Sequence, residues 1–177
     1  MSLAFPAVHD TRQEADTREP VTLLAPRQYQ AAAQAAYEDA ELLLTSILPD
    51  ARIEHVGASA VAGAMSRGGV DICVAVPRDA FDEALAVLCE AGYLQRSQED
   101  AADRHAALVA LDGPVAMTLQ LIESGSVHES LMRLRDALRA DAALLARYDA
   151  VKAAAAANGE AAYAQAKARF IADVLGD

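Results

Sequence analysis

The stretch ARIEHVGASAVAGAMSRGGVDICVAV, residues 51–76, holds the two strand patterns around which the rest of the chain is arranged. Residues 51–56 are apolar and β-branched enough for a buried strand, and Gly57-Ala58-Ser59 ends it at a close turn of the backbone. Residues 70–76 (VDICVAV) have the stronger strand pattern. The stretch therefore predicts a strand, a turn, a short helix or loop, and a second strand.

The second strand carries one charged residue, Asp71. A strand that is buried on both faces normally excludes an unpaired carboxylate, because removing its charge from water is costly. Two interpretations follow. Asp71 belongs to a ligand site, or it lies at a strand edge where its carboxylate accepts from backbone N–H groups or pairs with Arg67 or Arg52.

Helical periodicity flanks this unit on both sides. Ser126 and Glu129 have capping-box spacing, which predicts a helix start just after the last strand. Five helices are expected, over residues 27–48, 79–91, 127–138, 141–158 and 160–175.

Two further apolar runs, residues 105–111 and 115–122, are separated by the turn sequence Asp112-Gly113-Pro114 and predict an antiparallel hairpin. Strands and helices interleave without strict βαβ alternation. The order predicts an α+β fold with a mixed sheet, in preference to a doubly wound parallel fold.

Composition limits the classes of function. The net charge of −11 argues against a general nucleic-acid binder and leaves a small ligand or a basic partner. No apolar run approaches the roughly 20 residues of a membrane span, and the start of the chain lacks signal-peptide features, so we expect a cytoplasmic protein. Residues 1–20 are expected to form a flexible leader, and residues 21–177 a single domain.

The string IEHVGASAVAG at residues 53–63, followed by Val70-Asp71-Ile72, resembles the GrpB-like family, whose members look like small relatives of the DNA polymerase β-type nucleotidyltransferases. Residues 119–126, 134–148 and 162–175 also resemble segments of that family's sequences, so the resemblance spans roughly residues 21–175. It implies a nucleotidyltransferase-like α+β domain, in which helices flank a mixed sheet and a helical segment follows at the C-terminus.

The resemblance also implies a site. Gly57 and Ser59 would form a phosphate-binding turn, Arg67 would contact a phosphate, and Asp71 would be the catalytic residue and first ligand of Mg²⁺. Glu123 is either a solvated residue at a strand end or a metal ligand that lines the same cleft. The resemblance suggests nucleoside triphosphates as the substrates and transfer of a nucleotidyl group to a hydroxyl as the reaction.

Several positions depart from this pattern, and three of them bear on metal binding. Cys73 stands where a second carboxylate would share the face of Asp71, and a thiol is a poor ligand for Mg²⁺. Thr118 and Gln120 stand where the family usually carries a His-x-His pair. The leading hypothesis is a nucleotide- or phosphate-ligand-binding protein with metal-dependent nucleotidyl transfer. The alternative is an inactive pseudoenzyme that uses the cleft to bind a ligand or a partner.

Other polar residues have ordinary explanations. His55 is expected to be a satisfied core or edge histidine. Arg133, Arg135 and Arg139 are assigned to solvated helix faces, with a cluster of them over the cleft as the exception.

Overall fold

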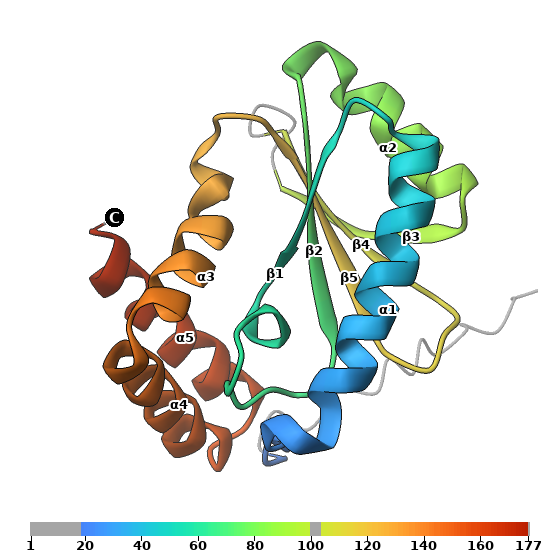
Figure 1. The fold of residues 1–177 in the computed structure, drawn as a ribbon. Helices are drawn as coiled ribbons and strands as arrows, with labels where there is room; N and C mark the ends of the chain where they lie inside the picture. The colour runs from blue at the N-terminus through green and yellow to red at the C-terminus, as the bar shows by residue number, and fades with distance from the viewer. Residues whose placement is uncertain (1–18, 100–103, 177) are drawn as a thin grey trace, which may run out of the picture.

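The computed structural model describes residues 19–99 and 104–176, so the leader predicted over residues 1–20 lies almost wholly outside the described residues. The domain consists of a five-stranded sheet with helices on both faces (Figure 1). The main elements are α1 (Pro26–Ile47), β1 (Arg52–Val56), β2 (Val70–Val76), α2 (Phe81–Glu90), β3 (Tyr93–Glu99), β4 (His105–Ala110), β5 (Met117–Glu123), α3 (Ser130–Ala140), α4 (Ala142–Ala156) and α5 (Glu160–Leu175).

The sheet is mixed and has the strand order β1-β2-β5-β4-β3. Strands β1 and β2 pair antiparallel, which confirms that the two strands of residues 51–76 are neighbours. Strand β2 pairs parallel with β5, while β5–β4 and β4–β3 are antiparallel, so the predicted hairpin is also confirmed. The α+β fold expected from the order of elements is therefore correct.

The alternation of side chains along β2 gives the sheet two different faces. Val70, Ile72, Val74 and Val76 belong to the main core, which the sheet forms with α1 and α2. Asp71, Cys73 and Ala75 point to the opposite face, where Cys73 and Ala75 pack with Met132 of α3. Asp71 is thus placed on the side of the C-terminal helices.

Helices α3, α4 and α5 form a cap on that side of the sheet (Figure 1). Their apolar residues Leu134, Leu138, Tyr148 and Phe170 form a second core with Val61 of the β1–β2 connection. Asp141 caps α4, because its carboxylate accepts from the backbone N–H groups of residues 143 and 144. The cap and the connection are therefore packed as one unit.

The capping box predicted for Ser126 and Glu129 is wrong. A 3₁₀ turn over Val127–Glu129 precedes α3, and the Ser126 side chain makes no capping hydrogen bond. The Glu129 carboxylate instead accepts from the backbone N–H of Gly125 at 3.0 Å and from Arg52 at 2.7 Å. In the described residues, no helix has both the length and the apolar character of a membrane span.

Candidate functional site

A cavity of about 580 Å³ lies between the sheet and the helical cap. Its floor includes Asp71, Thr118 and Gln120, which share one face of β2 and β5 because Asp71 is in register with Thr118 and Cys73 with Gln120. The β1–β2 connection and helices α3, α4 and α5 supply its walls. The lining residues from these walls include Gly57, Ser66, Arg67, Leu134, Arg135, Leu138, Tyr148, Lys152, Tyr163, Lys167 and Ile171.

Asp71 is the one acidic side chain among the described residues that line this cavity. Within the described part of the chain, its carboxylate forms no hydrogen bond and no ion pair. Burial raises the pKa of Asp71 above its ordinary value of 3.8, and the nearby positive charge of Lys167 opposes that rise. A desolvated carboxylate without a partner costs free energy of folding. Asp71 is therefore available to interact with a ligand.

Gly57 makes room for this carboxylate. Its backbone has φ +72° and ψ −170°, a conformation that is essentially restricted to glycine. A Cβ at this position would stand 2.4 Å from Asp71 Oδ2. Both the conformation and the space therefore require glycine here, next to Asp71 at the edge of the cavity.

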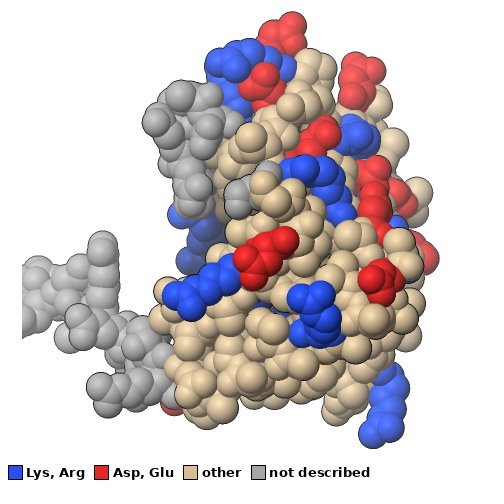
Figure 2. All heavy atoms as spheres, turned by 90° about the vertical axis from the view of Figure 1, so that its left-hand side faces the viewer, with Lys and Arg blue, Asp and Glu red and all other residues tan. Residues whose placement is uncertain are grey.

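Four cationic side chains of the described residues line the cavity, namely Arg67, Arg135, Lys152 and Lys167. They gather at one site in a chain whose net charge is −11. The outer surface on the cap side instead intersperses Lys and Arg with Asp and Glu (Figure 2). The charge of the cavity lining is therefore a local feature that favours an anionic ligand.

Lys152 is 1% exposed and joins α4 to the β1–β2 connection. Its ammonium lies 2.8 Å from Asp149 Oδ1, donates to the carbonyl of Met65, and lies 4.5 Å from the centroid of the Tyr148 ring. The same Asp149 carboxylate accepts from the backbone N–H of Met65. Burial lowers the pKa of Lys152, while Asp149 raises it. These contacts hold in place the segment that carries Arg67.

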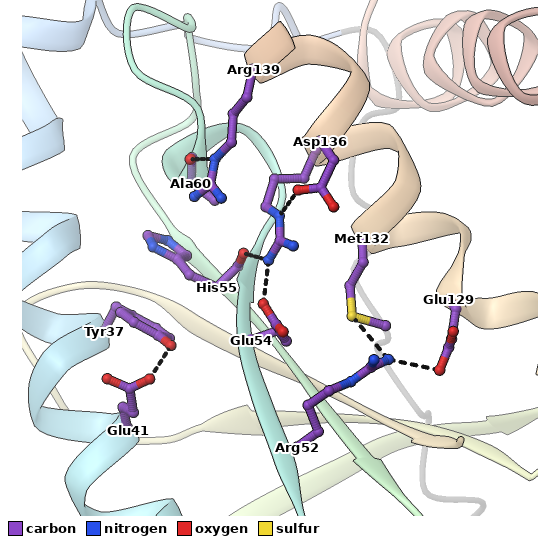
Figure 3. Close-up of polar contacts among 11 residues, drawn as sticks. Tyr37, Glu41, Arg52, Glu54, His55, Ala60, Glu129, Met132, Asp136 and Arg139 are labelled. Carbon is purple, nitrogen blue, oxygen red and sulfur yellow. Dashed lines mark hydrogen bonds and ion pairs between the residues drawn. The ribbon is translucent and has the colours of Figure 1, made fainter. Parts of the chain in front are cut away.

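Arg135 joins α3 to strand β1 through Glu54, which is labelled in Figure 3. Its guanidinium donates to Glu54 at 2.6 Å, to the carbonyl of His55 at 2.9 Å and to Asp136 at 2.8 Å. The residue is 8% exposed, so its assignment to a solvated face is wrong. Arg139 is exposed, and it donates to the carbonyl of Ala60 at 2.9 Å. Of the three arginines only Arg135 lines the cavity, so the described residues do not form the cluster over the cleft that was considered as the exception.

The predicted phosphate turn is only partly at the cavity. Gly57 lines it, but the Ser59 hydroxyl is buried 3.0 Å from His55 Nε2 and does not line the cavity. The His55 ring stacks on Tyr37, with ring centroids 4.5 Å apart (Figure 3). Burial, together with Arg139 and Arg135, lowers the pKa of His55 to about 4. His55 is therefore a satisfied core histidine, as expected.

Glu123 lies away from Asp71. It is in register with Val76, whereas Asp71 is in register with Thr118, so five strand positions, roughly 16 Å, separate the two carboxylates. Glu123 forms an ion pair with Arg78 at 3.0 Å. The fold therefore does not bring Glu123 and Asp71 together as ligands of one metal ion.

The residues around Asp71 do not fit the paired-carboxylate Mg²⁺ site that the resemblance implies. Cys73 is fully buried, and burial raises its thiol pKa to about 12. Thr118 and Gln120 are neutral, and Gln120 Oε1 lies 2.7 Å from His105 Nε2. Among the residues that the structure describes, no group of three His, Cys, Asp or Glu side chains could hold a metal. Asp71 would be a single carboxylate ligand beside cationic neighbours.

Lys152, Lys167 and the tyrosines beside them were not among the residues predicted for the site. Each lysine follows a buried tyrosine by four residues, Lys152 after Tyr148 and Lys167 after Tyr163. Residues four apart lie on one face of a helix. The sequence signal that could have indicated these residues is therefore a lysine on the same helix face as a buried tyrosine.

The fold and this site define a class: an α+β protein with a mixed sheet, a C-terminal helical cap and a cation-lined cavity between them. Residues 24–177 match the family model described as GrpB protein. The chain belongs to the GrpB protein family, as the resemblance implied.

The chain is similar to the following individual protein and solved structures. A UPF0157 protein of Vibrio cholerae is 32% identical over 149 residues, which covers 84% of this chain and 79% of that protein. The crystal structure of the conserved protein GrpB from Enterococcus faecalis has a TM-score of 0.64 at 18% identity, covering 87% of this chain and 99% of that chain. A crystal structure of the Cid1 poly(U) polymerase with MgGTP bound has a TM-score of 0.48 at 20% identity, over 70% of this chain and 41% of that chain.

Proposed function

We propose that this GrpB-family protein binds a phosphorylated small molecule in the cavity beside Asp71, a nucleotide being the ligand class that the family resemblance implies. The observation that carries the proposal is the cavity lining, in which four cationic side chains gather within a chain of net charge −11. Phosphate oxygens are the anionic groups that clustered Lys and Arg side chains bind best.

The apolar part of the lining supports a ligand that also has an organic moiety. Leu134, Leu138 and Ile171 line the cap side, together with the tyrosines Tyr148 and Tyr163. Pockets for small molecules are mostly apolar, with a few polar groups that fix orientation. The cavity volume of about 580 Å³ is also within the range of such sites.

Two activities are compatible with this binding. Metal-dependent nucleotidyl transfer is the reaction that the resemblance implies, and it would need a metal ion held at Asp71. The second candidate is a binding protein without catalysis. That candidate is favoured by the neutral residues Cys73, Thr118 and Gln120 around Asp71, because two-metal phosphoryl transfer needs more than one carboxylate.

Isothermal titration calorimetry against nucleoside mono-, di- and triphosphates tests the binding proposal. We expect at least one of these ligands to bind the wild-type protein and to bind Lys167→Gln at least roughly tenfold more weakly. Arg78→Gln is the matched control, because it removes a cation that pairs with Glu123 and does not line the cavity. Absence of binding by every phosphorylated ligand would overturn the proposed function. Release of pyrophosphate during turnover of a bound triphosphate would favour the transferase over the binding protein.

A further inference from the structure

The four cations of the cavity differ in how far they are already neutralised. Three of them have carboxylate partners at 2.6–2.8 Å that lie outside the cavity lining. These pairs are Arg67 with Glu160, Arg135 with Glu54 and Asp136, and Lys152 with Asp149. A ligand in the cavity therefore meets three cations whose charge is largely neutralised by carboxylates outside the cavity lining.

Lys167 is the exception. Among the described residues it has no ion-pair partner, and its ammonium lies 5.4 Å from the centroid of the Tyr163 ring. Its charge also acts on Asp71, the acidic residue of the lining. One uncompensated cation thus stands in the same cavity as one unpaired carboxylate.

A divalent metal ion at Asp71 would meet an unfavourable field. The sheet offers it one carboxylate, since Cys73 is a buried thiol and Thr118 and Gln120 are neutral. The ammonium of Lys167 repels a cation at that place, and the described residues of the lining include no second acid to offset this repulsion. Mg²⁺ requires oxygen ligands, and its binding weakens as nearby positive charge increases.

From these observations we propose that the cavity binds a phosphate monoester without a metal ion, and that Lys167 supplies the positive charge that a metal would otherwise supply. This inference rests on the proposed function of the same cavity. One uncompensated cation balances a single phosphoryl group better than a triphosphate. Asp71 is then available to accept a hydrogen bond from a hydroxyl group of the ligand.

Calorimetric titration with the mono-, di- and triphosphates of the four ribonucleosides, in EDTA and again in Mg²⁺, tests the inference. We expect a monophosphate to bind most tightly in EDTA, with less than about a twofold change in affinity when Mg²⁺ is added. We also expect the Lys167→Gln variant to lose at least roughly tenfold in affinity for that monophosphate, whereas Arg78→Gln keeps it.

The possible failures are distinguishable. If Mg²⁺ tightens a triphosphate by roughly tenfold or more, and that complex is the tightest, the inference is overturned while the proposed function stands. If no phosphorylated ligand binds in either buffer, the proposed function and the inference fail together.

Two carboxylate variants test the charge balance directly. Glu160→Gln leaves Arg67 uncompensated at the cavity, and Glu123→Gln leaves Arg78 uncompensated away from it. We expect Glu160→Gln to raise the affinity for di- and triphosphates relative to monophosphates several-fold, and Glu123→Gln to leave this ratio unchanged. Equal ratios in the two variants would contradict the argument from compensated cations.

Discussion

The carboxylate of Asp71 packs so closely against Gly57 that a Cβ at residue 57 would stand 2.4 Å from Asp71 Oδ2. The turn after β1 therefore controls where the acidic group of the cavity can lie. Gly57 belongs to the β1–β2 connection and Asp71 to β2, and the antiparallel pairing of Val56 with Asp71 brings them together. The position of the carboxylate is a product of this strand pair.

Replacing Gly57 with alanine should affect both stability and binding. The backbone conformation of residue 57 is strained for any residue with a Cβ, so we expect Gly57→Ala to lower the free energy of unfolding by about 1–3 kcal/mol. The added methyl group should also displace Asp71 and weaken ligand binding. Denaturant unfolding and calorimetry measure the two effects.

Gly125→Ala is the matched control for that variant. Gly125 also has a positive φ, +78°, but a Cβ there would meet no atom within 4 Å. This variant should lose stability through backbone strain alone and should keep wild-type affinity for the ligand. Normal binding by Gly57→Ala would contradict the close relationship between residue 57 and the site.

The difference in stability between the Asp71→Asn variant and the wild type should depend on pH. The pKa of Asp71 is higher in the folded protein than its ordinary value of 3.8, so the folded state binds the proton more tightly. The contribution of Asp71 to stability is therefore complete below pH 3.8 and is lost as the pH rises through the folded pKa. Asparagine has no charge to desolvate. We expect Asp71→Asn to melt at a higher temperature than wild type at about pH 7, with the difference shrinking as the pH falls toward about 4.

Glu123, whose side chain is 23% exposed, provides the comparison for this pH series. Glu123→Gln removes one partner of the ion pair with Arg78, which is 65% exposed, and should change stability by less than about 1 kcal/mol. A wild-type protein that melts at a higher temperature than Asp71→Asn at neutral pH, without any ligand, would show that Asp71 is stabilised by a partner instead of being left unpaired.

His55 should titrate far below an ordinary histidine. Its pKa is lowered from 6.5 to about 4, so the unfolded chain binds the proton first as the pH falls. The stability that neutral His55 contributes is complete above pH 6.5 and is lost as the pH falls toward 4, by roughly 3 kcal/mol in total. NMR titration of the imidazole resonances measures this directly. A midpoint near 6.5 for His55 would contradict its burial between Tyr37 and Ser59.

Removing Lys152 should be much more damaging than removing Arg67. Lys152→Met leaves the Asp149 carboxylate without its ammonium in a buried place, and we expect a loss of about 3–5 kcal/mol in the free energy of unfolding. Arg67→Gln breaks an ion pair whose two side chains are each 55% exposed, so the expected change is below about 1 kcal/mol. Similar losses in urea unfolding of the two variants would contradict a structural role for Lys152.

Much of the fold could be predicted because its signals are local. Alternation along residues 70–76 placed Asp71 and Cys73 on one face, and the turn at residues 112–114 predicted the β4–β5 hairpin. Helix α1 spans 26–47, within one residue of the range expected from its periodicity. The capping box failed because a 3₁₀ turn, which the same residue types also permit, comes before α3.

The site was less predictable, because its members are joined by packing between distant segments. Gly57, Arg67 and Asp71 could be predicted for the site from the sequence motif. No local signal showed that the Ser59 hydroxyl would lie within hydrogen-bond distance of His55, or that Glu123 would lie five strand positions from Asp71. Strand register and the choice of hydrogen-bond partner are set by the assembled sheet.

Side-chain periodicity along the chain thus specifies which residues are strand, helix or turn, and which face of β2 carries its acid. Only the tertiary structure places Arg135, Lys152 and Lys167, which come from three different helices, around a carboxylate more than 60 positions earlier in the sequence. The physical reason is that periodicity depends on neighbours within one turn or two residues, whereas the cavity depends on how the helical cap packs against the sheet.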